Sequence, residues 1–142
     1  MPHERTFSII KPDAVGRNII GPVIGQFERG GLSVAAAKMI RLDTAKAEGF
    51  YAEHKGKEFY DPLIVFMTSG PCIVLVLEGE DAVQKSRAIM GKTNFAEAGP
   101  DTIRRRFGTS IRYNAVHGSD SPASAAREIT YFFAPGEIFS RA

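Results

Sequence analysis

Cysteine is almost absent from this sequence, in which Cys72 is the single example among 142 residues. One cysteine excludes an internal disulfide framework and any zinc site built from paired cysteines, so a reducing compartment is the simplest interpretation. Internal repeats, linkers and low-complexity tracts are also missing, and the composition is close to the average for globular proteins. These features exclude a collagen-like repeat, a coiled coil and a disordered tail. We therefore expect one domain over residues 1–142.

A long apolar segment is missing as well. The longest stretch without a charged residue, 62–77, is shorter than the roughly 18 residues that a membrane-spanning helix needs, and Ser69-Gly70-Pro71 interrupts it. The first five residues lack the basic start and the apolar run of a secretory signal. We therefore expect a cytoplasmic protein that makes no contact with a membrane.

There is little net charge, because 18 Lys and Arg against 16 Asp and Glu give +2. This excess is too small to indicate a nucleic-acid partner by itself, although the pI of about 8.8 suits an anionic ligand. Charge alone therefore does not decide the function.

Several common catalytic motifs are absent. Gly91-Lys92-Thr93 resembles the end of a P-loop, but the glycine required five residues earlier is replaced by Ser86. Neither Gly-x-Ser-x-Gly, Gly-x-Gly-x-x-Gly nor His-Glu-x-x-His occurs. Serine hydrolases, dinucleotide-binding enzymes and zinc proteases are therefore without support.

The hydrophobic pattern predicts an alternation of strands and helices. Strands are expected over 6–11, 32–42, 72–77 and 114–117, and helices over 21–28, 45–54, 62–68, 80–90, 101–107 and 122–133. Thr44 and Ser121 are the expected N-caps of two of these helices, and the acidic pair Glu80-Asp81 opens another. Four strands interleaved with helices indicate an open sheet with helices packed on it.

A polar cluster lies at the junction of the last strand and the last helix. Residues 114–121 read Asn-Ala-Val-His-Gly-Ser-Asp-Ser, so His117 is expected at a strand end. A histidine with an unperturbed pKa of about 6.5 can be a neutral nucleophile near pH 7. Gly118 is expected to leave space beside the ring for a phosphoryl group. The alternative for His117 is a role in capping a turn, and we interpret His3 and His54 as residues without a catalytic role.

Three basic residues lie in separate parts of the chain. Lys11 follows the first predicted strand, Arg87 lies on a predicted helix and Arg104 follows a loop rich in Gly and Pro. Scattered cations suit a triphosphate, because phosphoryl transfer is catalysed mainly by positioning and by stabilising charge on the non-bridging oxygens. The alternative for each is a solvated surface charge, since sequence spacing does not show that the three converge.

Several ordered blocks of the chain resemble the nucleoside diphosphate kinase family. These blocks are residues 4–15, 51–55, 59, 67–71, 102–104 and 114–121. The resemblance implies a single-domain, ferredoxin-like α+β fold with a four-stranded antiparallel sheet. It also implies an enzyme that moves the γ-phosphate of a nucleoside triphosphate, typically ATP, to a nucleoside diphosphate and so maintains nucleoside triphosphate pools.

The resemblance assigns His117 as the nucleophile, which carries the phosphate as phosphohistidine between donor and acceptor in a ping-pong reaction. Glu128, with Ser119 behind it, matches the carboxylate that orients the imidazole. Tyr51 matches a tyrosine near the histidine. The positions that hold phosphates and sugar in the family are matched by Lys11, Arg87, Thr93, Arg104 and Asn114.

For the base, the resemblance implies a stacking site that tolerates any nucleobase. Phe59 matches the aromatic residue on which the base stacks, and Ile111 matches the apolar residue opposite. Magnesium is expected on the β- and γ-phosphates with mostly water ligands, and no protein metal site is expected. Family members are oligomers built from a common dimer, and the short tail after Ile138-Phe139 together with an altered loop favours a tetramer over a hexamer.

The loop before the last strand departs from the family pattern. Phe95, Asp101 and Arg106 stand where family members commonly have a proline, a glycine and an acid. These departures leave unchanged every position assigned to chemistry. Their effect on loop order, subunit packing and anion attraction stays open.

The alternative function is a nonenzymatic nucleic-acid-binding module. It is indicated by Arg104-Arg105-Arg106, the basic pI and ten phenylalanines on a sheet-bearing fold. The sequence lacks the Lys/Arg-Gly-Phe/Tyr-Gly/Ala-Phe pattern of the common RNA-binding sheet domain. Nucleic acid is therefore the weaker hypothesis.

Overall fold

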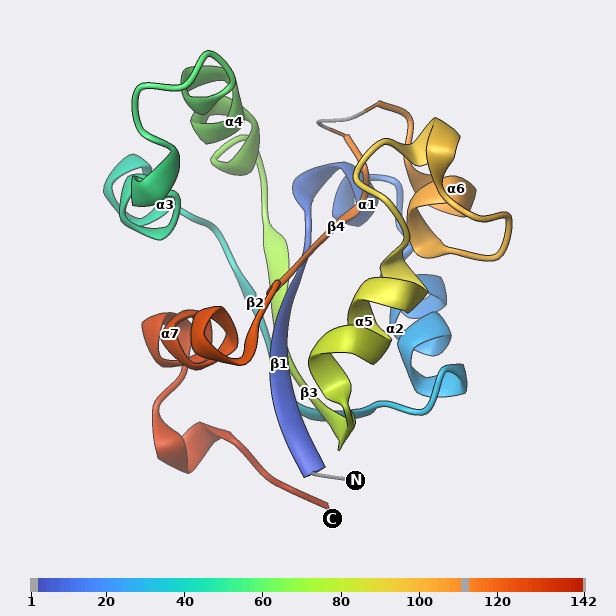
Figure 1. Cartoon of the computed structure of the whole chain (residues 1–142). Helices are drawn as coiled ribbons and strands as arrows, with labels where there is room; N and C mark the ends of the chain where they lie inside the picture. Colours follow the sequence, from blue (N-terminus) through green and yellow to red (C-terminus); the bar gives the residue numbers. More distant parts are fainter. Residues whose placement is uncertain (1–2, 111–112, 142) are drawn as a thin grey trace.

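The computed structural model describes residues 3–110 and 113–141 of the chain. Its elements, drawn in Figure 1, are β1 (His3–Ile10), α1 (Pro12–Gly16), α2 (Ile20–Arg29), β2 (Ser33–Ile40), α3 (Thr44–Phe50), η1 (Ala52–His54), α4 (Tyr60–Met67), β3 (Cys72–Glu80), α5 (Ala82–Met90), η2 (Phe95–Glu97), α6 (Ile103–Phe107), β4 (Val116–Gly118), α7 (Pro122–Phe132) and η3 (Pro135–Glu137). Within those two ranges, none of the helices has the length and apolar character that a bilayer crossing requires.

The four strands form one antiparallel sheet in the order β2-β3-β1-β4. The central strands β1 and β3 pair from His3 opposite Glu80 to Ile10 opposite Ile73. The short β4 pairs with the last three residues of β1, which places His117 opposite Ile9. This sheet has the four antiparallel strands that the family resemblance implied.

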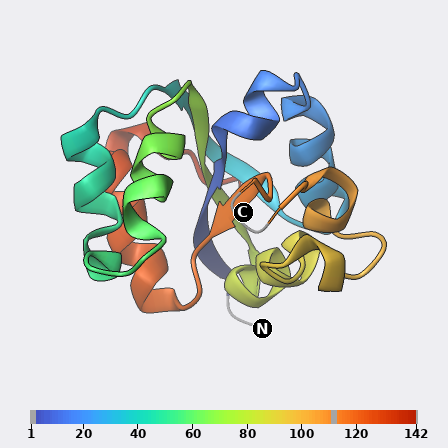
Figure 2. The ribbon, with the colours of Figure 1, turned by 90° about the horizontal axis from the view of Figure 1, so that it is seen from above.

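Side-chain alternation along the central strands divides the core into one layer on each face of the sheet. In β3, the even-numbered residues 72–76 belong to one apolar cluster and the odd-numbered residues 73–77 to the other. Helices α3, α4 and α7 cover the first face, and α1, α2, α5 and α6 cover the second (Figures 1 and 2). The continuous apolar run of β3 is therefore that of a strand buried on both faces.

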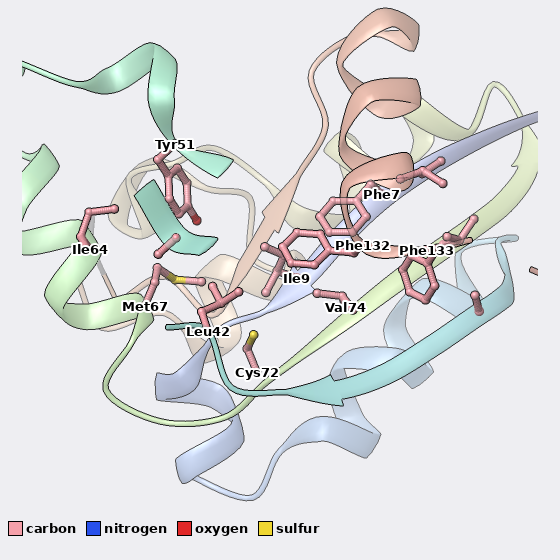
Figure 3. Packing of buried hydrophobic residues seen from close by; sticks show 14 of the residues in the cluster. Phe7, Ile9, Leu42, Tyr51, Ile64, Met67, Cys72, Val74, Phe132 and Phe133 are labelled. Carbon is pink, nitrogen blue, oxygen red and sulfur yellow. The ribbon is translucent and has the colours of Figure 1, made fainter. Parts of the chain in front are cut away.

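Aromatic rings fill the face under α7 (Figure 3). Phe7 of β1 and Phe132 of α7 are stacked with ring centroids 5.4 Å apart, and Phe50 packs against Phe7 at 5.8 Å. Cys72 is a free thiol in the same cluster, and burial raises its pKa to about 11. This thiol is therefore part of the core and is protonated at neutral pH.

The ends of two helices differ from the sequence predictions. The predicted cap Thr44 is instead the first residue of α3, and the cap is Asp43, whose carboxylate accepts from the N–H of Lys46 at 2.7 Å. Aspartate is the stronger N-cap of these two neighbouring residues, so the prediction placed the helix start one residue too late. Helix α5 begins at Ala82, so the acidic pair precedes it; Asp81 occupies the N-cap position without a side-chain bond, and the N–H of Val83 donates to Glu4 of β1 at 2.8 Å.

Other boundaries differ as well. The sequence analysis gave no helix at α1, because five residues are too few to show a helical period. Helix α3 ends at Phe50 and a separate 3-10 turn follows, where one helix to residue 54 was expected. The last strand begins at Val116, not at residue 114, because Ala115 has a φ of 73° that a strand cannot continue through.

Candidate active site

Eight of the eleven sequence-predicted residues line a cleft of about 550 Å³ at the end of the sheet where β1 and β4 pair. Residues far apart in the chain contribute to it. Its lining comprises Lys11, Tyr51, His54, Phe59, Leu63, Arg87, Thr93, Arg104, Asn114, His117, Gly118 and Asp120.

His117 is held by a carboxylate at one ring nitrogen. Its Nε2 lies 3.1 Å from Oε1 of Glu128, and the hydroxyl of Ser119 donates to the same oxygen at 2.6 Å. Glu128 lies on α7, whose start is fixed by a capping box between Ser121 and Ser124. The strand end and the helix start therefore fix the imidazole and its partner relative to each other.

The ionisation of Glu128 sets the tautomer of His117. Burial acts to raise the pKa of Glu128, but hydrogen bonds from His117 and Ser119 and the nearby charge of Arg127 hold the pKa below its usual value. The ionised carboxylate can only accept hydrogen bonds, so Nε2 carries the proton and Nδ1 carries the lone pair. Nδ1 is therefore the nitrogen available to a substrate.

Aromatic rings limit the orientation of the imidazole. Phe50 and Phe7 meet its ring edge-on, with centroids 5.3 and 6.2 Å away. Tyr51 does the same at 6.3 Å, and its buried hydroxyl has no hydrogen-bond partner within the described chain. Burial raises the pKa of Tyr51, and the nearby acidic groups Cys72 and Glu128 act in the same direction. The hydroxyl is thus a neutral donor close to the histidine.

Lys11 directly follows β1, where Pro12 begins a short helix. Its ammonium group donates to Oδ1 of Asn114 at 2.9 Å, and its side chain is 8% exposed. Desolvation lowers the pKa of Lys11 to about 8, with a smaller contribution from Arg104 and an opposing one from Asp13. A cation held out of water in this way binds an anion strongly.

Arg104 reaches the cleft from α6. Its two terminal nitrogens donate to the carbonyls of Gly91 and Val116 at 3.0 and 2.9 Å, and its buried Nε has no partner among the described residues. Desolvation and the charge of Arg87 lower the pKa of Arg104 to about 10, so it stays charged at neutral pH. Arg87 lies exposed on α5 and lines the same cleft.

Asn114 connects two parts of the lining. Besides accepting from Lys11, its side-chain amide donates to the carbonyl of Thr93 at 3.1 Å. This bond helps to hold Thr93, on the loop between α5 and α6, at the cleft wall. The structure brings these predicted residues together, whereas Ile111 lies outside the described residues.

The cleft lining includes Phe59, which the sequence analysis assigned to base stacking, and three residues to which it gave no role in the site. Phe59 is 46% exposed, and its ring contacts that of His54 at 5.3 Å. His54, Leu63 and Asp120 line the cleft, although His54 was interpreted as having no catalytic role. The signal for His54 and Asp120 was their place inside the family-like blocks, whereas Leu63 carried no signal.

Gly118 has a steric role in addition to the one expected. A Cβ atom at this position would overlap Cε of Met90 and lie 2.7 Å from its Sδ, so the Cβ direction at Gly118 is filled by α5, while the residue itself lines the cleft beside His117. The glycine is needed because β4 approaches α5 closely.

The three consecutive arginines on α6 make hydrogen bonds within the protein. Besides the two carbonyl contacts of Arg104, Arg105 donates to the carbonyl of Ala96 at 2.8 Å and Arg106 to the side chain of Gln26 at 2.7 Å. These contacts account for the run without a nucleic-acid ligand.

Comparison with known proteins decides between the two hypotheses. The nucleoside diphosphate kinase family model matches residues 4–138. The chain belongs to the nucleoside diphosphate kinase family. It is an enzyme that transfers the terminal phosphate of a nucleoside triphosphate to a nucleoside diphosphate, and the comparisons give no support to a nucleic-acid-binding module.

Solved nucleoside diphosphate kinases share the fold. The Aquifex aeolicus enzyme is 43% identical, with a TM-score of 0.94 over 96% of this chain and 99% of that one. The Halobacterium salinarum enzyme, solved with CDP, is 40% identical with a TM-score of 0.95 over 99% and 94%. The Encephalitozoon cuniculi enzyme is 36% identical with a TM-score of 0.90 over 94% and 91%. The ferredoxin-like α+β prediction is thereby confirmed.

Proposed function

We propose that Nδ1 of His117 is the atom that receives the phosphate. Its lone pair attacks the γ-phosphorus of a nucleoside triphosphate, the N–P bond forms, and the bond from that phosphorus to the bridging oxygen breaks. The nucleoside diphosphate leaves with the bonding electrons. A second nucleoside diphosphate then attacks the phosphohistidine in the reverse sense, which gives a ping-pong reaction.

Glu128 is the proposed positioning group of this reaction. Attack by Nδ1 places positive charge on the imidazole, and the carboxylate 3.1 Å from Nε2 stabilises that charge. The hydroxyl of Ser119 holds the carboxylate from behind. The engagement of Nε2 by Glu128 is the single observation that most supports Nδ1 as the nucleophile.

The phosphates are proposed to bind where the cations converge. Lys11, Arg87 and Arg104 supply charge that offsets the charge on the non-bridging oxygens. Thr93 and Asn114 supply uncharged hydrogen-bonding groups for phosphate and sugar. Tyr51 adds a neutral donor beside His117.

The base is proposed to stack on Phe59 at the mouth of the cleft, with Ile111 opposite. An exposed aromatic ring accepts any base, because every base has a π-face. The Halobacterium salinarum relative was solved with CDP, which supports a nucleoside diphosphate as ligand here. We therefore expect broad tolerance of the base.

Magnesium is proposed to enter on the β- and γ-phosphates. Asp120 is the carboxylate of the described cleft lining, so the donor set suits an ion that keeps mostly water and phosphate ligands. Hydrogen bonding from Ser124 lowers the pKa of Asp120 despite some desolvation. When bound, the ion neutralises charge on the phosphates.

The remaining parts of the proposal concern the whole chain. We place the kinase domain over residues 1–142, in the cytoplasm, where it maintains nucleoside triphosphate pools. The altered loop at Phe95, Asp101 and Arg106 supports a tetramer built from dimers. A sedimentation mass of six subunits would overturn the tetramer.

The test of the chemistry is incubation with γ-labelled ATP and magnesium. We expect label on the protein that survives alkali, is lost in acid and moves to added GDP. His117→Ala should take up no label while it still binds nucleotide. Labelling of His117→Ala, or none on folded wild-type protein, would exclude His117 as the phosphate carrier.

A further inference from the structure

Helix α6 rests on α2, an element that contributes no residue to the described lining of the cleft. The contact is made by Gln26, whose side chain is 8% exposed. Its Nε2 donates to the carbonyl of Asp101, just before α6, and its Oε1 accepts from Nη1 of Arg106 at 2.7 Å. A single buried amide therefore holds both ends of the segment that carries Arg104.

The buried amide needs these contacts. Gln26 lies three residues after Val23 and beside Phe27, both fully buried in the apolar cluster. A polar group in such surroundings is costly unless it is hydrogen-bonded. The bond from Arg106 is charge-assisted and is therefore among the stronger kinds. Removing either side chain leaves a polar group of the other without its partner.

The connection to the cleft runs through a short rigid element. Helix α6 has five residues, and Arg104 lies two residues before Arg106. Ile103 anchors one side of α6 in the core at zero exposure, while Arg104 extends to the carbonyls of Gly91 and Val116. A shift of the Arg106 end of α6 therefore moves the guanidinium of Arg104.

We propose that Gln26 and Arg106 are positioning residues of the kinase, which hold α6 so that Arg104 meets the nucleotide phosphates. The inference rests on the proposed phosphate contact of Arg104. It also gives Arg106, a departure from the family pattern, a role other than attracting anions, because its guanidinium is engaged with Gln26 and lies 5.1 Å from the ring centroid of Phe107.

The experiment compares Arg106→Met, Gln26→Met and the double variant with wild type. Gln84→Met and Arg29→Met are matched controls, because both residues are exposed on α5 and α2 and lie outside the cleft lining. We call the contact of Gln26 with Arg106 and the carbonyl of Asp101 the clasp, and its three variants the clasp variants. We expect KM for MgATP to rise about tenfold in each clasp variant, with a smaller change in kcat, since an ångström of misplacement costs up to about a hundredfold. The double variant should equal the worse single variant.

A second readout is the alkaline limb of kcat/KM, since the charge of Arg104 helps to lower the pKa of Lys11, against the opposing Asp13. If α6 moves, this limb shifts to higher pH in the clasp variants. Unchanged KM and an unchanged limb, with only a lower Tm, would overturn the proposal and leave the clasp a purely structural contact. Because Arg106 is exposed, Arg106→Met is expected to fold, so the test stays informative even if Gln26→Met fails to fold.

Arg104→Ala separates this inference from the proposed function. If Arg104→Ala raises KM for MgATP and the clasp variants do not, the positioning role is wrong and the phosphate contact stands. If Arg104→Ala itself leaves KM unchanged, the phosphate contact fails and the positioning role fails with it.

Discussion

Lys11 holds a positive charge where water hardly reaches it, and this costs stability. Lowering the pKa from 10.5 to about 8 corresponds to about 3 kcal/mol at neutral pH. The unfolded chain binds more protons between those two pH values, so the contribution of Lys11 to stability rises with pH across that window. Binding of phosphate requires the charged form, so activity depends on pH in the opposite direction.

The first prediction concerns this opposite dependence. We expect kcat/KM for MgATP to fall as pH rises through about 8, because the free enzyme then loses the proton of Lys11. Bound phosphates favour the charged form of Lys11, so kcat should stay constant up to a higher pH than kcat/KM does. The measurement is a pH profile of both constants.

Lys11→Arg is the matched variant for that profile. A guanidinium stays protonated, so the alkaline limb of kcat/KM should move to higher pH. The maximum of kcat/KM should fall, because a planar, forked guanidinium does not reproduce the contacts of an ammonium group. An alkaline limb that stays in place in Lys11→Arg would show that another group titrates there.

The second prediction concerns the partner of His117. Glu128→Gln keeps the shape but removes the charge that fixes the tautomer and stabilises the imidazolium. The rate of phosphohistidine formation should fall about tenfold to a hundredfold, as when a group that orients a functional histidine is removed. Rapid-quench labelling measures this rate.

Arg127→Gln is the control for Glu128→Gln. Its guanidinium lies 3.6 Å from the other carboxylate oxygen of Glu128 and is 58% exposed, so its loss should change the rate less than twofold or so. Equal effects of the two substitutions would contradict the role assigned to the hydrogen bond at Nε2.

At the scale of elements, the close approach of β4 to α5 places His117 beside the helix that carries Arg87. Gly118 permits this approach, because Met90 occupies the position that a Cβ atom would take. The pairing of β4 with β1 covers only three residues, so it provides little resistance to displacement.

The third prediction is that Gly118→Ala lowers the free energy of unfolding by about 1–3 kcal/mol, through overpacking against Met90. Urea unfolding measures the change. Combining it with Met90→Ala should recover part of the loss, and Gly16→Ala is the control because nothing lies within 4 Å of its Cβ position. If Gly118→Ala is as stable as the wild type, the close approach is not the reason for the glycine.

At the scale of the whole molecule, the cleft is built by segments on both sides of the sheet. Phe59 precedes α4 on one side, whereas Arg87 and Arg104 come from α5 and α6 on the other (Figures 1 and 2). A ligand that spans the cleft therefore connects parts that otherwise meet only through the sheet.

The fourth prediction is that MgADP stabilises the folded protein. At a hundred times its Kd the gain is about 2.7 kcal/mol, by mass action, at fixed protein concentration. Thermal unfolding should show it in the wild type and in His117→Ala, because the nucleophile is not needed for binding. Phe59→Ala should need more ligand for the same shift, and equal shifts at every concentration would argue against stacking.

The sequence by itself determined the order of the main strands and helices and the family. The apolar run of residues 72–77 marked β3, the hydroxyl of Ser121 marked the start of α7, and the block around His117 identified the kinase. Each of these is a local pattern, because strand burial, helix capping and motif spacing depend on neighbours in the chain.

Only the tertiary structure decided which groups meet. It brought Lys11 to Asn114 across more than a hundred residues, engaged Nε2 of His117 so that Nδ1 is left, and placed Arg106 on Gln26. It also placed Gly118 against Met90, which is on another element. The reason is physical: hydrogen bonds, desolvation and steric contact act through space over a few ångströms, so the spacing of residues along the chain carries no record of them.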